Sequence, residues 1–568
     1  QDVFLRFGSQ DRFSIFSSLY AAAANAWGIE RSAAALTLTF QLALIVSAWC
    51  LVRTVTNSSL ALLGCAIFIA VPAQYGADRV FTCIEAFVTP RMAAEALVLA
   101  SIACALHSRR KLAFAFLAVA ALFHPIMAAA GIAALCWLYI GLRHPRLVIL
   151  IMLLAALLLI AEAAWMPMGQ WGRFDPTWWV LVKNRSPYLF LVHWNLDDWS
   201  RALLSITTLA IGVMSLPVSK ARSLALVALL VVLSGLALSL LTCDVLHLTL
   251  FTQLQSWRWQ WLGSIAAALL MPKIIESQWH SSKAGSAAAL LLVSAWVFES
   301  GELSLIALTF AIACQAFSAR IAPQHARLFF YGACGMLAIC ILWRLASDFE
   351  FTESHYIDSH LPAAFKKLMS FCRDGLAPVA LIAAAWWWLR FQRRSATIAV
   401  GCLSVAAAAL VVPTMAEPWF EQEFSPAMIL QYASWRAKLP PGAEVLSVQS
   451  PLPVWLLLGR PNYISTAQSS GMVFSRATAL ELQHRAETLK DFIPPEATLG
   501  WESGGAISIR SSQQLEGICD LGAFDYLMTG VKLNREPIAI QPGKSPDDPR
   551  ALRLYQCRPQ ARAAAAAT

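Results

Sequence analysis

Long apolar runs separated by short polar breaks dominate residues 31–414 of the sequence. A helix needs about 20 apolar residues to cross the ~30 Å hydrocarbon core of a bilayer. Alternation with period two, the signature of a membrane barrel, is absent from these runs. Since only helices and closed barrels satisfy their backbone within lipid, we predict a polytopic α-helical membrane protein with about 12–14 membrane helices. The predicted spans are roughly 31–53, 58–75, 90–107, 111–124 with 125–142, 147–166, 201–217, 221–241, 259–275, 285–299, 302–319, 327–346, 374–391 and 395–414.

The run 111–142 is interrupted in its middle by His124 and Pro125. Proline removes a helical hydrogen bond, and the residue before it resists the helical conformation. The run is too short for two full spans, so we predict two short helices that meet below the membrane surface. Irregular backbone at that depth is tolerated only beside protein or a water-filled cavity. His124 therefore either faces such a cavity or packs as a satisfied core histidine.

The two ends of the chain differ from this helical domain. Residues 1–30 form a first outer loop, in which 12–27 is predicted to be an amphipathic helix lying in the membrane interface, capped by Ser9 or Asp11. Residues 415–560 have the composition of a soluble protein and are predicted to form an α/β domain, and 561–568 is a low-complexity tail.

Short β-like runs and helical patterns alternate within 415–560. Strands are predicted at 443–448 and 524–530, and helices at 424–438 and 474–491. Cys519 and Cys557 are the only cysteines of this domain. We predict a disulfide between them, as expected in an oxidising compartment, with two unpaired buried thiols as the alternative.

Composition and charge indicate which side of the membrane each loop faces. Of the 568 residues, 58% are hydrophobic and 14% are charged, against roughly a quarter charged in soluble domains. The net charge of +9 does not indicate nucleic-acid binding, because Lys and Arg concentrate in short loops, which is typical of cytoplasmic loops. The opposite loops are longer and rich in aromatic, acidic and amide residues. Since loops on a rigid scaffold carry chemistry, we expect the functional face and the C-terminal domain to be extracytoplasmic.

Three carboxylates of the predicted outer face are candidate catalytic groups. Asp2 and Asp11 precede the interfacial helix, where they act as a base, hold a metal, or serve only as caps and surface ion pairs. Glu85 precedes a Thr-Pro helix start, and the next helical turns carry Arg91 and Glu95. Arg91 and Glu95 are spaced i,i+4 and either pair structurally or face a cavity, since ionisable groups inside a membrane are costly.

Other candidates bind substrate rather than react. The loop 173–199 interleaves charged and aromatic residues, including Arg185, His193 and Trp194, and such mixtures suit sugar rings and lipid headgroups as well as membrane anchoring. Arg258 opens a predicted span, with Gln255 nearby, and a guanidinium there suits phosphate or snorkels to the interface. Within the soluble domain, Arg460 lies in a segment, 455–476, that either caps a cavity or belongs to the domain core.

Together these features resemble the GT-C superfamily of integral membrane glycosyltransferases. The resemblance rests on an acidic first outer loop before an interfacial helix, split short helices, an arginine-bearing outer loop and a C-terminal outer domain. The segments 85–95, 124–125 and 185–194 look like uncharacterised bacterial members. The resemblance implies that Asp2 or Asp11 is the base and that Arg258 or Arg91 binds phosphate.

The function implied by this resemblance is the transfer of a sugar from a polyprenyl-phosphate lipid to a glycan, lipid or protein acceptor, with inversion. It implies a location in a bacterial inner membrane and a role in the cell envelope, with the C-terminal domain in the periplasm. No cofactor is expected with certainty, a divalent cation is possible, and no metal ligands are assigned. A secondary transporter and a non-catalytic envelope-assembly protein are the alternatives, although no internal repeat of the transporter kind is visible.

Overall fold

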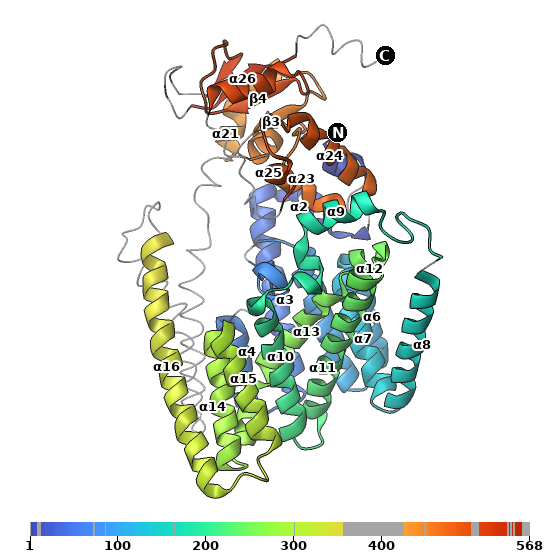
Figure 1. Ribbon diagram of the computed structural model, residues 1–568, viewed down its shortest axis with the longest axis vertical. Helices are drawn as coiled ribbons and strands as arrows, with labels where there is room; N and C mark the ends of the chain where they lie inside the picture. The colour runs from blue at the N-terminus through green and yellow to red at the C-terminus, as the bar shows by residue number, and fades with distance from the viewer. Residues whose placement is uncertain are drawn as a thin grey trace.

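The chain folds into a bundle of helices with a smaller α/β domain at one end, and the first residues lie beside that domain (Figure 1). The structure is a computed structural model. It describes residues 2–7, 13–71, 74–85, 87–163, 165–299, 301–355, 425–447, 450–500, 511–541, 545, 548 and 551–558. The predicted spans 374–391 and 395–414, together with Ser9 and Asp11, lie outside the described residues.

The helices of the bundle begin and end close to the predicted span limits. They are α2 (Phe16–Trp27), α3 (Ile29–Arg53), α4 (Ser58–Ala70), α5 (Pro90–Leu106), α6 (Arg110–Phe123), α7 (Pro125–Cys136), α8 (Pro145–Ala163), α10 (Leu196–Ser215), α11 (Lys220–Ser239), α13 (Gln260–Trp279), α14 (Lys283–Phe298), α15 (Gly301–Ala316) and α16 (Pro323–His355). Shorter helices α1 (Val3–Arg6), α9 (Pro176–Arg185) and α12 (Thr249–Leu254) lie toward the α/β domain. The hairpin β1 (Gln74–Tyr75) and β2 (Phe81–Thr82) follows α4.

Helix α13 is the centre of the bundle. It packs against α4, α10, α11 and α14, and its residues are buried on every side. A helix that is apolar around its whole circumference lies either in a protein core or in lipid, and the burial of α13 places it in the core. Gly64 of α4 lets the two backbones approach closely, because a Cβ there would lie 2.4 Å from the carbonyl oxygen of Leu269.

The break at His124 is confirmed, since α6 ends at Phe123 and α7 begins at Pro125. The last carbonyls of a helix have no partner inside it. Here the first outer loop supplies hydrogen-bond donors to these carbonyls. The Ile15 N–H donates to the Leu122 carbonyl at 3.0 Å, and the Ser14 hydroxyl donates to the Phe123 carbonyl at 2.6 Å. The end of α6 is thereby satisfied by a segment far away in the sequence.

The start of α2 differs from the expectation of a cap at Ser9 or Asp11. The helix begins at Phe16, four residues later than predicted, and the Ser14 hydroxyl accepts a hydrogen bond from the Phe16 N–H at 3.1 Å. The same hydroxyl donates to α6, so the tertiary contact fixes where the helix begins.

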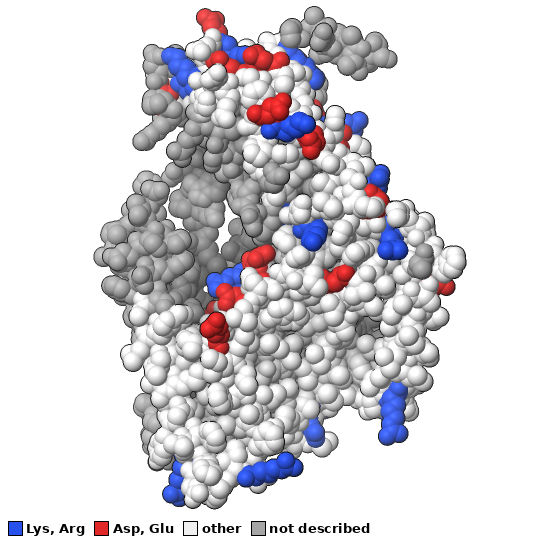
Figure 2. Space-filling view, in the orientation of Figure 1, with Lys and Arg blue, Asp and Glu red and all other residues white. Residues whose placement is uncertain are grey.

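Four helices among the described residues are long and apolar enough to cross a membrane: Ile29–Arg53, Pro145–Ala163, Lys220–Val245 and Pro323–Trp343. Nearly every side chain of α8 is exposed, including long aliphatic ones, as expected of a helix surrounded by lipid. Figure 2 shows a wide band of uncharged surface around the bundle on the face in view, with charged side chains above and below it. The chain is therefore a helical membrane protein.

The C-terminal α/β domain contains the predicted strands and helices. Its sheet has the order β3–β4–β6–β5, with β3 (Val445–Ser447) parallel to β4 (Tyr526–Thr529) and with β5 (Ala539–Ile540) and β6 (Arg553–Gln556) antiparallel. Parallel neighbours need a long crossover, and helices fill it. The helices of the domain are α21 (Pro426–Gln431), α22 (Ala433–Lys438), α23 (Thr466–Ser469), α24 (Arg476–Leu489), α25 (Pro495–Leu499) and α26 (Ser512–Asp520).

The predicted disulfide between Cys519 and Cys557 is present and joins α26 to the end of β6. It closes a loop of 38 residues in sequence separation. A cross-link of this kind stabilises a domain mainly by restricting its unfolded chain.

We predict that Cys557→Ser, or reduction of the wild-type protein, destabilises the C-terminal domain by about 2–4 kcal/mol while leaving the bundle folded. Thermal unfolding followed by limited proteolysis distinguishes the two parts. Reduction of the Cys557→Ser variant is the control and has no further effect. Equal protease resistance of the oxidised and reduced wild-type domain would contradict the prediction.

Candidate functional site

A polar cluster lies at the end of the bundle nearest the C-terminal domain, around the β1–β2 hairpin. Tyr75 and Phe81 pair across this hairpin, and their rings stack with centroids 5.6 Å apart. The ring of Phe81 also contacts Trp257, with centroids 5.9 Å apart. Gly76 opens the turn with φ +81°, and a Cβ at this position would lie 2.3 Å from a ring atom of Trp257. The hairpin and the start of α13 therefore fit together only with glycine at this position.

Two guanidinium groups share the ring of Phe81. The Cζ of Arg91, from the first turn of α5, lies 4.9 Å from the ring centroid, and the Cζ of Arg258 lies 4.1 Å from it. An aromatic face attracts cations by about 0.5–2 kcal/mol. Two like charges so close together still repel, so the site needs negative charge nearby.

Glu85 supplies that charge, and its direct contact is with Arg91. Its Oε1 accepts a hydrogen bond of 2.8 Å from Arg91 Nε and forms an ion pair with the same guanidinium. Its Oε2 accepts a hydrogen bond from the Thr89 hydroxyl, and its backbone carbonyl accepts one of 2.8 Å from Gln41 Nε2. Glu85 is 4% exposed. Arg91 thus pairs with Glu85 rather than with Glu95, which corrects the i,i+4 pair offered by the sequence, because the chain before α5 folds back onto its first turn.

Arg258 has a different environment. It is 7% exposed, and within the described part of the chain it has no carboxylate at ion-pair distance. Its Nε donates to Gln255 Oε1 at 2.6 Å. Gln255 lies in the left-handed region, at φ +50° and ψ +54°, a conformation that costs energy for a residue with a side chain. A strained residue therefore orients a nearly buried cation whose hydrogen-bonding partner is neutral.

Further donors near Arg258 also lack partners. The side-chain N–H groups of Trp257, Gln260 and Trp261 are buried without a hydrogen-bond partner in the described residues. Trp257 lies in the 3-10 helix Ser256–Trp259, and Gln260 and Trp261 begin α13 directly after it. The segment therefore presents several unused donors beside a cation, a combination suited to a ligand with many acceptor oxygens.

His124 belongs to the same region. It caps α7, since its Nδ1 accepts from the Met127 N–H at 3.3 Å, and its side chain is half-buried. Arg258 and Arg91 both lie within electrostatic reach of its ring. The structure thus brings together five of the predicted residues from three separate parts of the sequence: Glu85, Arg91, His124, Gln255 and Arg258.

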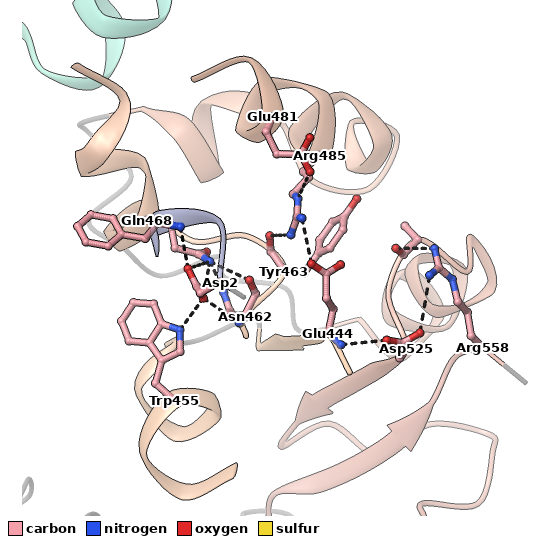
Figure 3. Close-up of polar contacts among 12 residues, drawn as sticks. Asp2, Glu444, Trp455, Asn462, Tyr463, Gln468, Glu481, Arg485, Asp525 and Arg558 are labelled. Carbon is pink, nitrogen blue, oxygen red and sulfur yellow. Dashed lines mark hydrogen bonds and ion pairs between the residues drawn. The ribbon is translucent and has the colours of Figure 1, made fainter. Parts of the chain in front are cut away.

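Asp2 lies elsewhere, in the contact between the N-terminal segment and the C-terminal domain. Its carboxylate accepts hydrogen bonds from Trp455 Nε1 at 2.8 Å, from the Asn462 N–H at 3.1 Å and from Gln468 Nε2 at 2.9 Å (Figure 3). It also caps α1 through the Phe4 N–H. A carboxylate with this many donors anchors the N-terminal segment to the C-terminal domain, and the catalytic role of Asp2 stays a prediction.

The aromatic loop 173–199 forms hydrogen bonds with the C-terminal domain. Arg185 Nε donates to the Ser469 hydroxyl at 2.6 Å, and its guanidinium also donates to the Thr466 carbonyl at 3.0 Å. Trp178 Nε1 donates to the Met472 carbonyl at 2.8 Å. The loop predicted to bind sugars or lipid is therefore a docking surface for the segment 462–476, and this segment covers the loop.

The remaining predicted residues take different places. Trp194 is buried, with its ring centroid 6.0 Å from that of Trp257, so it packs behind the cluster. His193 is exposed beside Phe190. Arg460 donates to the carbonyls of Arg436, Leu439 and Pro440 inside the C-terminal domain. The contacts of His193 and Arg460 thus lie away from the cluster around Phe81.

One connection joins the docked domain to Arg258. Gln253 Nε2 donates to the Val473 carbonyl at 3.0 Å, and Gln253 Oε1 accepts from Gln170. Two residues later, Gln255 holds Arg258. The segment 253–255 therefore contacts the C-terminal domain through Gln253 and the buried Arg258 through Gln255.

Sequence reasoning missed the aromatic half of the cluster. The site acquires these rings because a hairpin with two residues in each strand packs against the segment before α13. The rings are those of Tyr75, Phe81 and Trp257. The one signal in the sequence was the aromatic spacing around Gly76. No group of three or more His, Cys, Asp or Glu side chains with metal-binding geometry occurs among the residues described. Comparison of the chain with protein-family models, curated proteins and solved structures finds no match.

We predict that Gly76→Ala destabilises the protein by about 2–4 kcal/mol, because strain at its φ of +81° adds to overpacking against Trp257. Gly28→Ala is a matched control: Gly28 has φ +85°, and a Cβ added there would have no atom within 4 Å, so only the strain remains. Thermal unfolding monitored by tryptophan fluorescence compares the two. Equal losses in both variants would show that the contact with Trp257 contributes nothing.

A second prediction concerns pH. Burial raises the pKa of Asp175, but hydrogen bonds from Arg476 and from the Trp178 N–H lower it by more, so its net pKa lies below the usual value. A carboxylate with a lowered pKa in the folded state stabilises that state above its unfolded pKa, about 3.9, and loses this effect as pH falls through the folded value.

We therefore expect Asp175→Asn to lower stability near pH 7 and to have a smaller effect near pH 3, because the stabilisation declines as pH falls below the unfolded pKa. The loss should be about 1 kcal/mol or less, because Arg476 is half-exposed. Melting temperatures of wild type, Asp175→Asn, Arg476→Gln and the double variant, measured at both pH values, form the test. Losses that add in the double variant at pH 7 would mean that the ion pair does not couple the loop to the domain.

Proposed function

We propose that this protein is a membrane glycosyltransferase of the GT-C type, which takes a sugar from a polyprenyl-phosphate lipid. The observation that supports this most directly is Arg258, a cation that is 7% exposed and whose Nε donates its hydrogen bond to a neutral amide. Burying a charge without a charged partner is costly, and such cations are retained where a ligand supplies the opposite charge.

Phosphate fits this position by charge and by hydrogen bonding. A guanidinium binds phosphate oxygens through paired N–H donors and keeps its charge at any physiological pH. Arg91 lies on the same ring of Phe81, and the start of α13 adds unused donors from Trp257 and Gln260. A phosphate here would relieve the repulsion between the two arginines and satisfy the buried donors together.

Glu85 is the carboxylate that we assign to the reaction. It contacts Arg91, which shares the ring of Phe81 with Arg258, whereas Asp2 contacts the C-terminal domain and Asp11 is outside the described residues. In the proposed step Glu85 takes the proton of an acceptor hydroxyl as the oxygen attacks the anomeric carbon with inversion. The bond from that carbon to the phosphate oxygen breaks, its electron pair stays on the phosphate, and Arg258 stabilises the charge that develops.

The location of the cluster agrees with a lipid substrate. Arg258 lies close in sequence to Gln253, which contacts the C-terminal domain, and α8 leaves a long apolar surface exposed on the bundle. On the face seen in Figure 2 the end of the bundle opposite the domain carries basic residues without acidic ones. Since basic loops favour the cytoplasm, we assign the domain and the cluster to the extracytoplasmic side of a bacterial inner membrane.

The C-terminal domain then serves as a cover and as the platform for the acceptor, which is a glycan, a lipid or a protein. Its segment 462–476 contacts the loop that carries Trp178 and Arg185 and reaches Gln253, next to the cluster. A domain fixed in this way excludes water from one side of the reaction, which favours transfer over hydrolysis.

Binding of undecaprenyl phosphate tests the proposal. We expect Arg258→Gln to weaken its binding about tenfold to a hundredfold, as for the loss of a charged hydrogen bond, and to abolish sugar transfer. Arg320→Gln, which removes an exposed arginine between α15 and α16, is the control and leaves both unchanged. Uncharged undecaprenol measures the contribution of the lipid tail.

Two results would contradict the proposal. Equal affinity of the wild-type protein for undecaprenyl phosphate and undecaprenol would remove the phosphate site. Phosphate binding with full transfer activity in the Glu85→Gln variant would remove the assigned base. Movement of an intact lipid or solute across proteoliposomes without transfer would favour the transporter alternative.

A further inference from the structure

A second pair of polar groups is buried beside the arginines. Glu95, in the second turn of α5, is 1% exposed, and neither of its carboxyl oxygens has a hydrogen-bond partner in the described residues. Tyr75 is also 1% exposed, and its hydroxyl likewise has no partner there. The Tyr75 hydroxyl lies close to the Glu95 carboxyl group, near hydrogen-bonding distance but without hydrogen-bonding geometry.

Such an arrangement needs an explanation, because buried polar atoms in folded proteins nearly always have partners. An unsatisfied carboxyl group costs the full desolvation of that group. The nearest cation along the helix, Arg91, does not relieve it, since its Nε and its ion pair are directed to Glu85. Two acceptor oxygens and one hydroxyl are thus held unused by rigid elements, α5 and the β1–β2 hairpin.

The position of the pair relates it to the proposed phosphate site. Tyr75 stacks on Phe81, and Phe81 carries Arg91 and Arg258 on its ring. The phosphate-binding donors and the unused acceptors therefore lie around one aromatic pair. A ligand that joins an anion to hydrogen-bond donors would satisfy both groups at once, and aromatic faces favour the C–H faces of sugar rings.

We propose that Glu95 and Tyr75 form the subsite that binds hydroxyl groups of the transferred sugar. This inference rests on the proposed function and adds the part of the substrate that is recognised. The carboxylate accepts hydrogen bonds from two neighbouring hydroxyls, one for each oxygen, and the tyrosine hydroxyl donates to a third oxygen. A site built to bind a hydroxyl discriminates strongly against a sugar that lacks it, because its buried groups then stay unpaired.

The experiment compares two ligands in lipid nanodiscs, undecaprenyl phosphate and its glycosylated form. The sugar is chosen from glucose, galactose, mannose and arabinose as the one that binds wild type most tightly. We expect that sugar to improve binding over undecaprenyl phosphate alone. Glu95→Gln and Tyr75→Phe should each reduce this improvement about tenfold or more while leaving the affinity for undecaprenyl phosphate unchanged. Glu30→Gln, at an exposed position in the first turn of α3, is the control.

Tyr75→Phe keeps the ring that stacks on Phe81, so it carries the test if Glu95→Gln does not fold. Deoxy versions of the chosen sugar provide a test on the unaltered protein. At least one deoxy ligand should bind wild type as weakly as the full sugar ligand binds Tyr75→Phe or Glu95→Gln. Combining that deoxy ligand with that variant should reduce the affinity little further.

The outcomes separate this inference from the proposed function. If both variants keep the full preference for the glycosylated lipid, or if no sugar improves binding to wild type, the hydroxyl subsite is overturned while the phosphate site stands. If undecaprenyl phosphate binds wild type no better than undecaprenol, the proposed function fails first. Loss of affinity for both ligands in Tyr75→Phe would make the pair structural and would also overturn the inference.

Discussion

Keeping the charge of Arg258 in a nearly closed position is the constraint on which the cluster depends. The cation has an aromatic ring on one side and a neutral amide on its Nε. This explains several local oddities together: a strained Gln255 that aims its amide, a glycine at position 76 that admits Trp257, and a hairpin of minimal length that presents Phe81. Each costs energy locally, and the packing of α13 on all sides holds them in place.

Within the described residues the cluster contains two arginines and two glutamates, of which Arg91 and Glu85 form an ion pair. Arg91 and Glu85 neutralise each other directly, whereas Arg258 and Glu95 take part in no ion pair within the described part of the chain. A protein that needed only stability would gain by replacing such separated charges with apolar residues. Their presence beside aromatic rings is a common property of sites that are completed by a ligand.

Much of the bundle could be predicted from hydropathy, because lipid leaves so few alternatives for the backbone. The break at His124 followed from one proline, and the strands of the outer domain followed from short β-like runs. The meeting of Glu85, Arg91 and Arg258 was partly visible, since the first two belong to one predicted segment and Arg258 to another, and all three are predicted site residues. The sequence could not show which side chains pair with each other. Arg91 forms its ion pair with Glu85 instead of Glu95, and Asp2 accepts hydrogen bonds from a domain that begins hundreds of residues later. Such contacts depend on how the chain folds back, which no local pattern encodes.

The hydrogen bond between Asp2 and Gln468 joins residues separated by 466 positions, and it has a consequence for biosynthesis. A ribosome makes the first of these residues long before the second, so the anchor of the N-terminal segment does not exist while the bundle is being inserted. Contacts of such long sequence separation form late, after local helices and hairpins. The contact between the N-terminal segment and the C-terminal domain therefore forms last, and a chain truncated before its final domain would insert with this N-terminal segment unanchored.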